Sequence, residues 1–287
     1  MSALLRLVQG SAEWHAHRSQ YCNASETPAV LGVSPWVTPY QLWAIKTGRA
    51  TQETTPAMQY GTDTEPLARA AYEQLTRTVM QPKVMVTGAY SASLDGINFG
   101  GDLIVEIKCP VKGQASELWK QAASGNIPAH YQWQVQHQLM VSEAKLAHFY
   151  IFDGKRGLLL DVYPAPEQWL TIVREWTAFR HYLDTDTPPP LTERDTRIRT
   201  DQDWQQAAEA YIQIKHQADA LGAQLDAARE QLVQLASHNS ESGFGVSFSR
   251  YWKQGSVQYK NVSALNGVDL ELYRGPKREE VRVTVLK

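Results

Sequence analysis

Two acidic residues and a lysine near the middle of the chain have the types and spacing that could hold a metal ion and activate water. Asp95 follows an apolar stretch, and Glu106 and Lys108 stand two positions apart in the segment VEIKCP. Residues two apart on a strand share a face, so Glu106 and Lys108 are expected to point the same way. Carboxylate oxygens are ligands that Mg²⁺ prefers, and a lysine beside them could orient or activate an attacking water.

The strands that carry these residues decide between two interpretations of the pattern. An isolated Glu-x-Lys is more simply an ion pair on the solvent face of a sheet, because short patterns match by chance. Here, strands are predicted over residues 83–94 and 102–109, with a glycine-rich turn that brings Asp95 beside Glu106. Two carboxylates would repel there, and a divalent cation between them would remove that cost and could stabilise the charge that develops in phosphodiester cleavage. The intervening positions of the second strand are predicted to face a helix-covered core.

Three helices are predicted ahead of these strands. The first has Ser11 as its N-cap, and the second begins at Thr38 and Pro39 and stops at Gly48. The third, over residues 61–76, has apolar side chains at helical spacing. These helices are candidates for the layer that covers the sheet.

Helices and strands also alternate after the Glu-x-Lys strand. A helix is predicted over residues 124–142 with Pro128 near its first turn, followed by a hairpin that turns around residues 155–157 and an amphipathic helix over residues 165–183. The segment 184–190 ends in three prolines, which cannot continue a helix or a central strand. We therefore predict an α/β core that ends at this segment.

Three regions are expected in the chain: a core over residues 1–190, a helical arm over 191–240 and a small, mildly basic β-rich tail over 241–287. The arm is rich in Ala, Gln and Glu, with a narrow apolar seam of the kind found in coiled coils. The seam includes Leu221, Leu225, Leu232 and Leu235. Gly222 interrupts it, and the helix could bend there.

Composition excludes several classes of protein. A formal net charge of −2 excludes a uniformly basic DNA-coating protein, although a local basic channel stays compatible with it. Two cysteines without a CxxC pattern indicate a reducing cytoplasm and argue against an iron–sulfur cluster. No GxxxxGK[ST] motif indicates ATP use, and no apolar run suggests a signal peptide or a membrane span. We therefore expect a cytoplasmic protein.

Residues 9–183 resemble the bacteriophage lambda exonuclease or YqaJ-type viral recombinase family, within the PD-(D/E)xK nuclease superfamily. Asp95 followed by Glu106-x-Lys108 is similar to the superfamily signature, although Leu94 stands where the family usually has proline. The blocks that carry the resemblance are, in order, EWHAHRSQYCNASE, YGTDTEPLAR, SLDG, VEIKCP and YQWQVQHQLMV. The resemblance implies a restriction-endonuclease-like mixed β-sheet flanked by helices.

The resemblance assigns roles around the metal. Asp95 and Glu106 would be ligands of Mg²⁺, with Mn²⁺ as an alternative, and the carbonyl of Ile107 would complete the shell. Lys108 would be the group that orients the water. Glu65 would approach the metal from its helix, the alternative being an ordinary first-turn acid that suits the helix dipole.

The same resemblance assigns residues to the substrate. Gln134 would contact the substrate or the attacking water, with Tyr131 near the DNA on the same helix; Gln138 is a weaker candidate, because a buried amide often only caps a backbone group. Arg18 would bind the 5′-terminal phosphate, with Ser25 donating to the same or the next phosphate. The alternative for Arg18 is a surface arginine lying over a tryptophan.

The function that the resemblance implies is a Mg²⁺-dependent deoxyribonuclease that digests duplex DNA from its 5′ ends and leaves 3′ single strands for recombination by annealing. It also implies a homotrimeric ring that threads DNA, a single-strand annealing protein as partner, and a location in a bacterial or phage-infected bacterial cell. Two alternatives are a structure-specific or nicking endonuclease of the same superfamily and an inactive DNA-binding scaffold. The intact acidic and basic set argues against the scaffold.

Overall fold

The chain forms two compact units in the computed structural model, Met1–Arg197 and Ile198–Lys287. The residues that the structure describes are 3–5, 7, 9–51, 53–253, 255–256, 259, 262, 265, 267–269 and 276. Within this described part, no helix is long and apolar enough to span a membrane.

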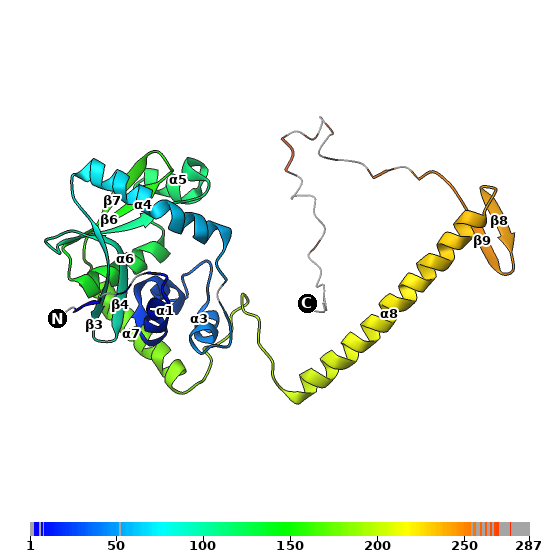
Figure 1. Ribbon diagram of the computed structural model, residues 1–287, viewed down its shortest axis with the longest axis horizontal. Coiled ribbons are helices and arrows are strands. Elements are labelled where there is room, and N and C mark those ends of the chain that lie inside the picture. Colours follow the sequence, from blue (N-terminus) through cyan, green and yellow to red (C-terminus); the bar gives the residue numbers. More distant parts are fainter. Residues whose placement is uncertain are drawn as a thin grey trace. The chain divides into compact units, whose positions relative to one another are not determined.

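A mixed sheet of seven strands, counted over the described residues, forms the centre of the first unit (Figure 1). Its strands are β1 (Ala3–Leu5), β2 (Cys22–Asn23), β3 (Gln81–Thr87), β4 (Tyr90–Ile97), β5 (Leu103–Lys108), β6 (Leu146–Phe152) and β7 (Gly157–Val162). The order is β1-β3-β4-β5-β6-β7, and β2 pairs with β4. The pairs β5·β6 and β2·β4 are parallel and the others antiparallel.

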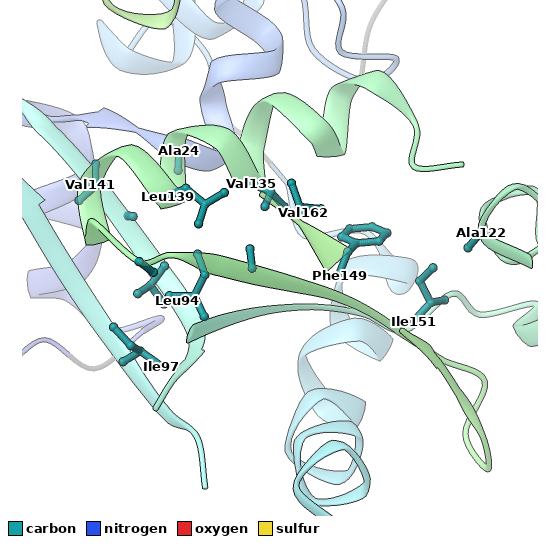
Figure 2. Close-up of a cluster of buried hydrophobic side chains, with 14 residues drawn as sticks. Ala24, Leu94, Ile97, Ala122, Val135, Leu139, Val141, Phe149, Ile151 and Val162 are labelled. Atoms are coloured by element: carbon teal, nitrogen blue, oxygen red, sulfur yellow. The ribbon is translucent and has the colours of Figure 1, made fainter. Parts of the chain in front are cut away.

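Helices cover both faces of this sheet. They are α1 (Ala12–Gln20), α2 (Thr27–Val30), α3 (Pro39–Lys46), α4 (Pro56–Thr76), α5 (Glu117–Ala123), α6 (Ala129–Ser142) and α7 (Pro166–Asp184), with short 3₁₀ turns at Ala24–Glu26 and Gly113–Ala115. Val105 and Ile107 of β5 pack with Ala68 and Tyr72 of α4. The opposite face packs against α6 (Figure 2).

Both faces of β5 are therefore buried. Val105 and Ile107 lie in the core as predicted, at 1% and 5% exposure. The alternate positions, Ile104 and Glu106, are equally buried, so the solvent-face interpretation of Glu-x-Lys is wrong. A strand covered on both sides loses the simple alternation of apolar and polar residues that marks a half-exposed strand.

The helix ends follow the capping signals of the sequence. Ser11 accepts a hydrogen bond from Trp14 N, and Thr38 forms a capping box with Gln41 ahead of Pro39. The helix predicted over residues 61–76 is confirmed but begins earlier, at Pro56, where Thr55 is the N-cap. These caps satisfy amide groups that would otherwise lack partners at the helix start.

One expected strand is wrong. Residues 83–94 do not form a single strand, because the chain turns between β3 and β4 at Gly88, which has φ +58°. That conformation costs glycine little, which is why the turn falls there. Asp95 consequently lies inside β4 and not at the end of the expected strand, since β4 continues to Ile97.

The second unit contains α8 (Gln202–Leu235) and a two-stranded sheet of β8 (Ser240–Gly243) and β9 (Val246–Ser249). Figure 1 shows α8 as one continuous helix, so the bend expected at Gly222 is not present. The predicted α/β core, helical arm and small β unit are thus confirmed as fold elements. The expected boundaries at residues 190 and 240 stay a prediction, and the segment EEVRVTV lies outside the described residues.

Candidate active site

Glu106 is a buried carboxylate at the centre of the candidate site. It is 2% exposed and lies on β5. Its Oε1 accepts a hydrogen bond from Gln134 Nε2 at 2.6 Å and lies 2.5 Å from Lys108 Nζ, while its Oε2 accepts from Gln138 Nε2 at 2.5 Å. A charged group is tolerated in a core only with partners of this kind, because burying a charge without them costs roughly several kcal/mol of folding free energy.

The two glutamines reach Glu106 because of their spacing on α6. Residues four apart lie on the same side of a helix, so Gln134 and Gln138 present their amides to the same strand. Val135 and Leu139 pack α6 against the sheet and are fully buried. The helix therefore supplies both the apolar cover and the two donors that hold the carboxylate.

Asp95 approaches β5 from the neighbouring strand β4. The antiparallel pairing of Gly96 with Val105 sets this register, and Asp95 Oδ2 accepts a hydrogen bond from Ile107 N at 2.8 Å. Burial, and then the charges of Glu106 and Glu65, raise the pKa of Asp95 well above its usual range. The site thus gathers more negative charge than its own protein donors offset.

Glu65 belongs to the same electrostatic neighbourhood but comes from α4. Its carboxylate pairs with Arg69 one turn further along the helix, and Arg69 Nε also donates to the backbone oxygen of Asp95 at 2.8 Å. Burial raises the pKa of Glu65, Arg69 opposes that rise, and Glu106 adds to it. Arg69 therefore connects α4 to β4 at Asp95 itself.

Lys108 lies between the acidic cluster and an aromatic ring. Its side chain is 24% exposed, and its Nζ is 5.0 Å from the ring centroid of Tyr131. Burial works to lower the pKa of Lys108, but the charge of Glu106, with smaller contributions from Tyr131 and Asp95, raises it above its usual value. Lys108 is therefore a cation in this arrangement and serves as the counter-ion of Glu106.

The donor set fits a hard divalent cation in kind. Asp95, Glu106 and Glu65 offer carboxylate oxygens, the ligands that Mg²⁺ and Mn²⁺ take. Burial first, and then the negative charges of Glu106 and Glu65, raise the pKa of Asp95, and a bound cation would oppose both effects. Among the described residues, no three His, Cys, Asp or Glu side chains converge as a ready metal site. In this structure Glu106 Oε1 is bound by Lys108 and by Gln134.

A second polar cluster surrounds Arg18, on α1. Its Nη1 donates to Ser25 Oγ at 3.1 Å, its Nη2 lies 3.0 Å from Glu26 Oε1, and its guanidinium stacks 4.7 Å from the ring centroid of Trp14. Lys46 Nζ lies 2.8 Å from Glu26 Oε2 and donates to the backbone oxygen of Arg18. Arg18 thus lies over Trp14 and is also oriented from the other side by Ser25 and Glu26.

The Arg18 cluster is tied to the strand that carries Asp95. Trp14 Nε1 donates to Ser93 Oγ at 2.9 Å, and the backbone oxygen of Ser93 accepts from Gln138 Nε2 at 3.4 Å. Ser93 lies two residues before Asp95 on β4. The helix that carries Arg18 and the helix that holds Glu106 therefore meet at the same strand.

The structure brings most of the predicted site residues into these two clusters. Glu106, Lys108, Asp95, Glu65, Gln134 and Tyr131 form the first, and Arg18 and Ser25 belong to the second. Ile107 contributes a backbone N–H to Asp95, while the role of its carbonyl stays a prediction. The catalytic and binding roles of the others likewise stay predictions.

Two residues of the first cluster were missed or undervalued from sequence. Gln138 was a weak candidate, yet it is 1% exposed and holds one oxygen of Glu106. Arg69 was not singled out, although its spacing of four from Glu65 on a predicted helix was the signal that could have found it.

Comparison with known sequences finds one family model that matches the middle of the first unit. Residues 13–145 match the YqaJ-like viral recombinase domain. The chain is also 27% identical over 151 residues to the uncharacterized protein YqaJ of Bacillus subtilis (strain 168). That match covers 50% of this chain and 46% of the relative, so the chain spans about half the length of that protein.

Solved structures share the fold. An alkaline exonuclease from Laribacter hongkongensis is 24% identical with a TM-score of 0.53, and the match covers 62% of this chain and 94% of that one. The same exonuclease in complex with dAMP is 22% identical with a TM-score of 0.51 and the same coverage. At this level of identity the likeness bears on the fold alone. Residues 13–145 are thus similar to the YqaJ-like viral recombinase domain, and the sheet of the first unit has the fold of the Laribacter hongkongensis alkaline exonuclease.

Proposed function

We propose that this protein is a Mg²⁺-dependent exonuclease that digests duplex DNA from its 5′ ends and leaves 3′ single strands. The observation that carries the proposal is the buried Glu106, held by Gln134, Gln138 and Lys108 beside Asp95, whose pKa is raised by burial and by the neighbouring carboxylates. Burying two acidic side chains side by side lowers the stability of a fold, and such pairs with raised pKa values are found most often at functional sites. The domain match and the named activity of the structural neighbour support the choice of nuclease chemistry.

Asp95 and Glu106 would hold the metal, with Glu65 and the carbonyl of Ile107 as further oxygen donors. When bound, the cation would supply positive charge for the phosphodiester group as it accumulates negative charge. Gln134 and Gln138 fix the Glu106 carboxylate, so the ligand oxygens need no reorganisation on binding. Lys108, released from Glu106 Oε1, would be free to orient a water for attack.

Arg18 would bind the 5′-terminal phosphate. Its hydrogen bonds to Ser25 and to Glu26 use two of the five N–H donors of a guanidinium, which leaves donors for phosphate oxygens. Lys46, with a side chain only 4% exposed, pairs with the second oxygen of Glu26 and so holds the carboxylate that orients Arg18. Ser25 and Tyr131 would contribute further contacts to the DNA.

The assembly and partners that go with this function are also proposals. A homotrimeric ring around DNA would keep the enzyme on its substrate between cleavages. Movement along the DNA would need no ATP, because the hydrolysis of each phosphodiester bond is itself favourable. The 3′ single strand would then be passed to a single-strand annealing protein. Both rest on the family resemblance, and Mn²⁺ would serve as an alternative metal.

An end-labelled duplex assay tests the function. Linear duplex with 5′-phosphate, linear duplex with 5′-hydroxyl and closed circular duplex are incubated with the full chain and Mg²⁺. The proposal expects nucleotide release from the 5′-phosphorylated end first, slower release from the hydroxyl end and none from the circle. Cleavage of the circle would instead favour the endonuclease alternative.

Two controls complete this experiment. The Asp95→Asn variant should bind the same DNA and release no nucleotide, because the amide lacks the metal-binding charge. Chelation of the metal should abolish release by the unaltered protein. If the unaltered protein binds DNA but releases no nucleotide from any substrate with either Mg²⁺ or Mn²⁺, the scaffold alternative replaces the enzyme.

A further inference from the structure

Helix α8 carries an apolar seam that repeats every seven residues. The seam starts at Trp204 and advances in alternating steps of three and four residues to Leu235, and every position on it is Trp, Tyr, Ile, Leu or Ala. Such a repeat over most of a 34-residue helix is the pattern of a coiled coil. No residue of α8 is buried, and Leu225 and Leu235 are 70% and 79% exposed.

The seam is complementary to itself when two copies run in opposite directions. The seam has two alternating positions in each heptad, the first starting at Trp204 and the second at Ala207. In an antiparallel pair, residues at the first position of one helix face residues at the second position of the other. With the two helices fully overlapped, every alanine of the seam then faces a large side chain. These pairs are Ala207 with Leu232, Ala218 with Leu221 and Ala228 with Tyr211. Small opposite large is the arrangement that fills a core at normal density.

The remaining layers of the same register are also apolar. Ile214 faces Leu225, and Trp204 faces Leu235. Shifting the two helices by one heptad leaves either Leu235 or Trp204 without a facing seam residue, depending on the direction of the shift. The fully overlapped register is therefore the one that covers the whole seam.

A parallel, in-register pair fits less well. It would set each seam alanine against its own copy and leave gaps on either side of the larger layers, and gaps lower the stability of a packed interface. It would also stack Trp204 on Trp204 at one end. Large-to-small matching thus favours the antiparallel direction.

The positions beside the seam agree with this direction. In the antiparallel register Lys215 faces Gly222 of the other copy, and Arg229 faces Ala208. No like charges meet, and each long basic side chain lies over a residue small enough to leave it room. Apart from its neighbours in α8, no atom of the described residues of the same copy lies within 4 Å of where a Cβ at Gly222 would be, and in this register the missing side chain leaves room for Lys215 of the other copy.

We propose that α8 is an interaction surface for a second copy of this chain, forming an antiparallel two-helix coiled coil in the fully overlapped register. The proposal goes beyond the nuclease function and does not depend on it. The two helices run for about 50 Å, at 1.5 Å per residue, so their N-termini lie at opposite ends of the pair. Pairing by α8 doubles whatever assembly the first unit forms.

The mass of the full chain in solution tests the surface. Leu225→Asp places a charge in the seam and should halve the mass measured by light scattering. Ala223→Asp, on the outer face of the same helix, adds the same charge and should leave the mass unchanged. Circular dichroism of both variants shows whether α8 remains helical. Equal masses for the unaltered chain and Leu225→Asp would overturn the proposal and leave the seam to another partner.

Crosslinking with a short bismaleimide tests the direction and register. Cys109→Ser removes the partly exposed native thiol, and Cys22 is buried. In that background, Ala207→Cys and Leu232→Cys are made as separate full-length proteins. The antiparallel register predicts no crosslinked dimer from either alone and a crosslinked dimer after the two are unfolded and refolded together. A parallel pair would crosslink each variant to itself, and that result would overturn the antiparallel assignment.

Discussion

Gln138 donates a hydrogen bond to Glu106 Oε2 at 2.5 Å from inside the protein core, where both side chains are nearly inaccessible to water. Gln134 makes the matching bond to Oε1 from one helical turn away. The carboxylate is therefore held on both oxygens by one helix. This relationship makes α6 part of the candidate site and not only its apolar cover.

Replacing Gln138 with methionine should weaken both stability and activity. Methionine keeps most of the volume but removes the donor, which leaves one oxygen of a buried charge without its partner, at a cost of about 1–3 kcal/mol. Urea denaturation of the full chain measures the loss. Gln132→Met on the same helix is the control, because its side chain does not bind Glu106. Equal midpoints for the two variants would show that the Gln138 bond contributes nothing.

Lys108→Ala should abolish most nucleotide release without unfolding the protein. Loss of a group that orients or activates water costs roughly 10²–10⁴-fold in rate. Glu106 retains Gln134 and Gln138, so the fold should tolerate the change. The rate of Mg²⁺-dependent release is compared with that of Lys112→Ala, an exposed lysine four residues away. Similar rates for both variants would remove Lys108 from the mechanism.

Arg18→Ala should reduce the preference for a 5′-phosphate over a 5′-hydroxyl end by about tenfold or more, since a hydrogen bond to a charged group is worth roughly 1.5–3 kcal/mol. Arg18→Lys should recover only part of the preference, because an ammonium lacks the bidentate fork. The measurement is the ratio of release rates from the two labelled ends. Arg174→Ala, an exposed arginine on α7, serves as the control. An unchanged ratio in Arg18→Ala would contradict the phosphate-binding role.

His137 should make the protein lose stability in mild acid. Burial lowers the pKa of His137 to about 3 in the folded protein, against about 6.5 when unfolded. Between these values the unfolded chain binds a proton that the folded chain does not, so this contribution is complete above about pH 6.5 and is lost at about 1.4 kcal/mol per pH unit as the pH falls.

The His137→Gln variant tests this dependence. Between pH 7 and pH 5 the unaltered protein should lose about 2 kcal/mol more of its unfolding free energy than the variant, which lacks the titrating ring. Urea denaturation at each pH measures the difference. His181→Gln, at an exposed position of α7, should behave like the unaltered protein. Parallel pH profiles for His137→Gln and the unaltered protein would refute the prediction.

Local signals explain why several elements could be predicted from sequence. Ser11 and Thr38 cap helices because their side chains accept bonds from amides two or three residues ahead, a property that needs no tertiary context. Local signals were not sufficient over residues 83–94, where one strand was predicted and Gly88 instead turns the chain. A glycine in an apolar run is compatible with a bulge, a turn or a plain strand, and the neighbouring strand decides.

The sequence by itself determined the types of residue in the candidate site and their order, since Asp95, Glu106 and Lys108 could be recognised by spacing and by the motifs around them. Only the tertiary structure decided that Glu106 is buried and that Gln138 and Arg69 belong beside it. The reason is physical. Spacing along a strand or helix states which side chains share a face, but the burial of that face and the partners brought to it depend on the elements packed against it.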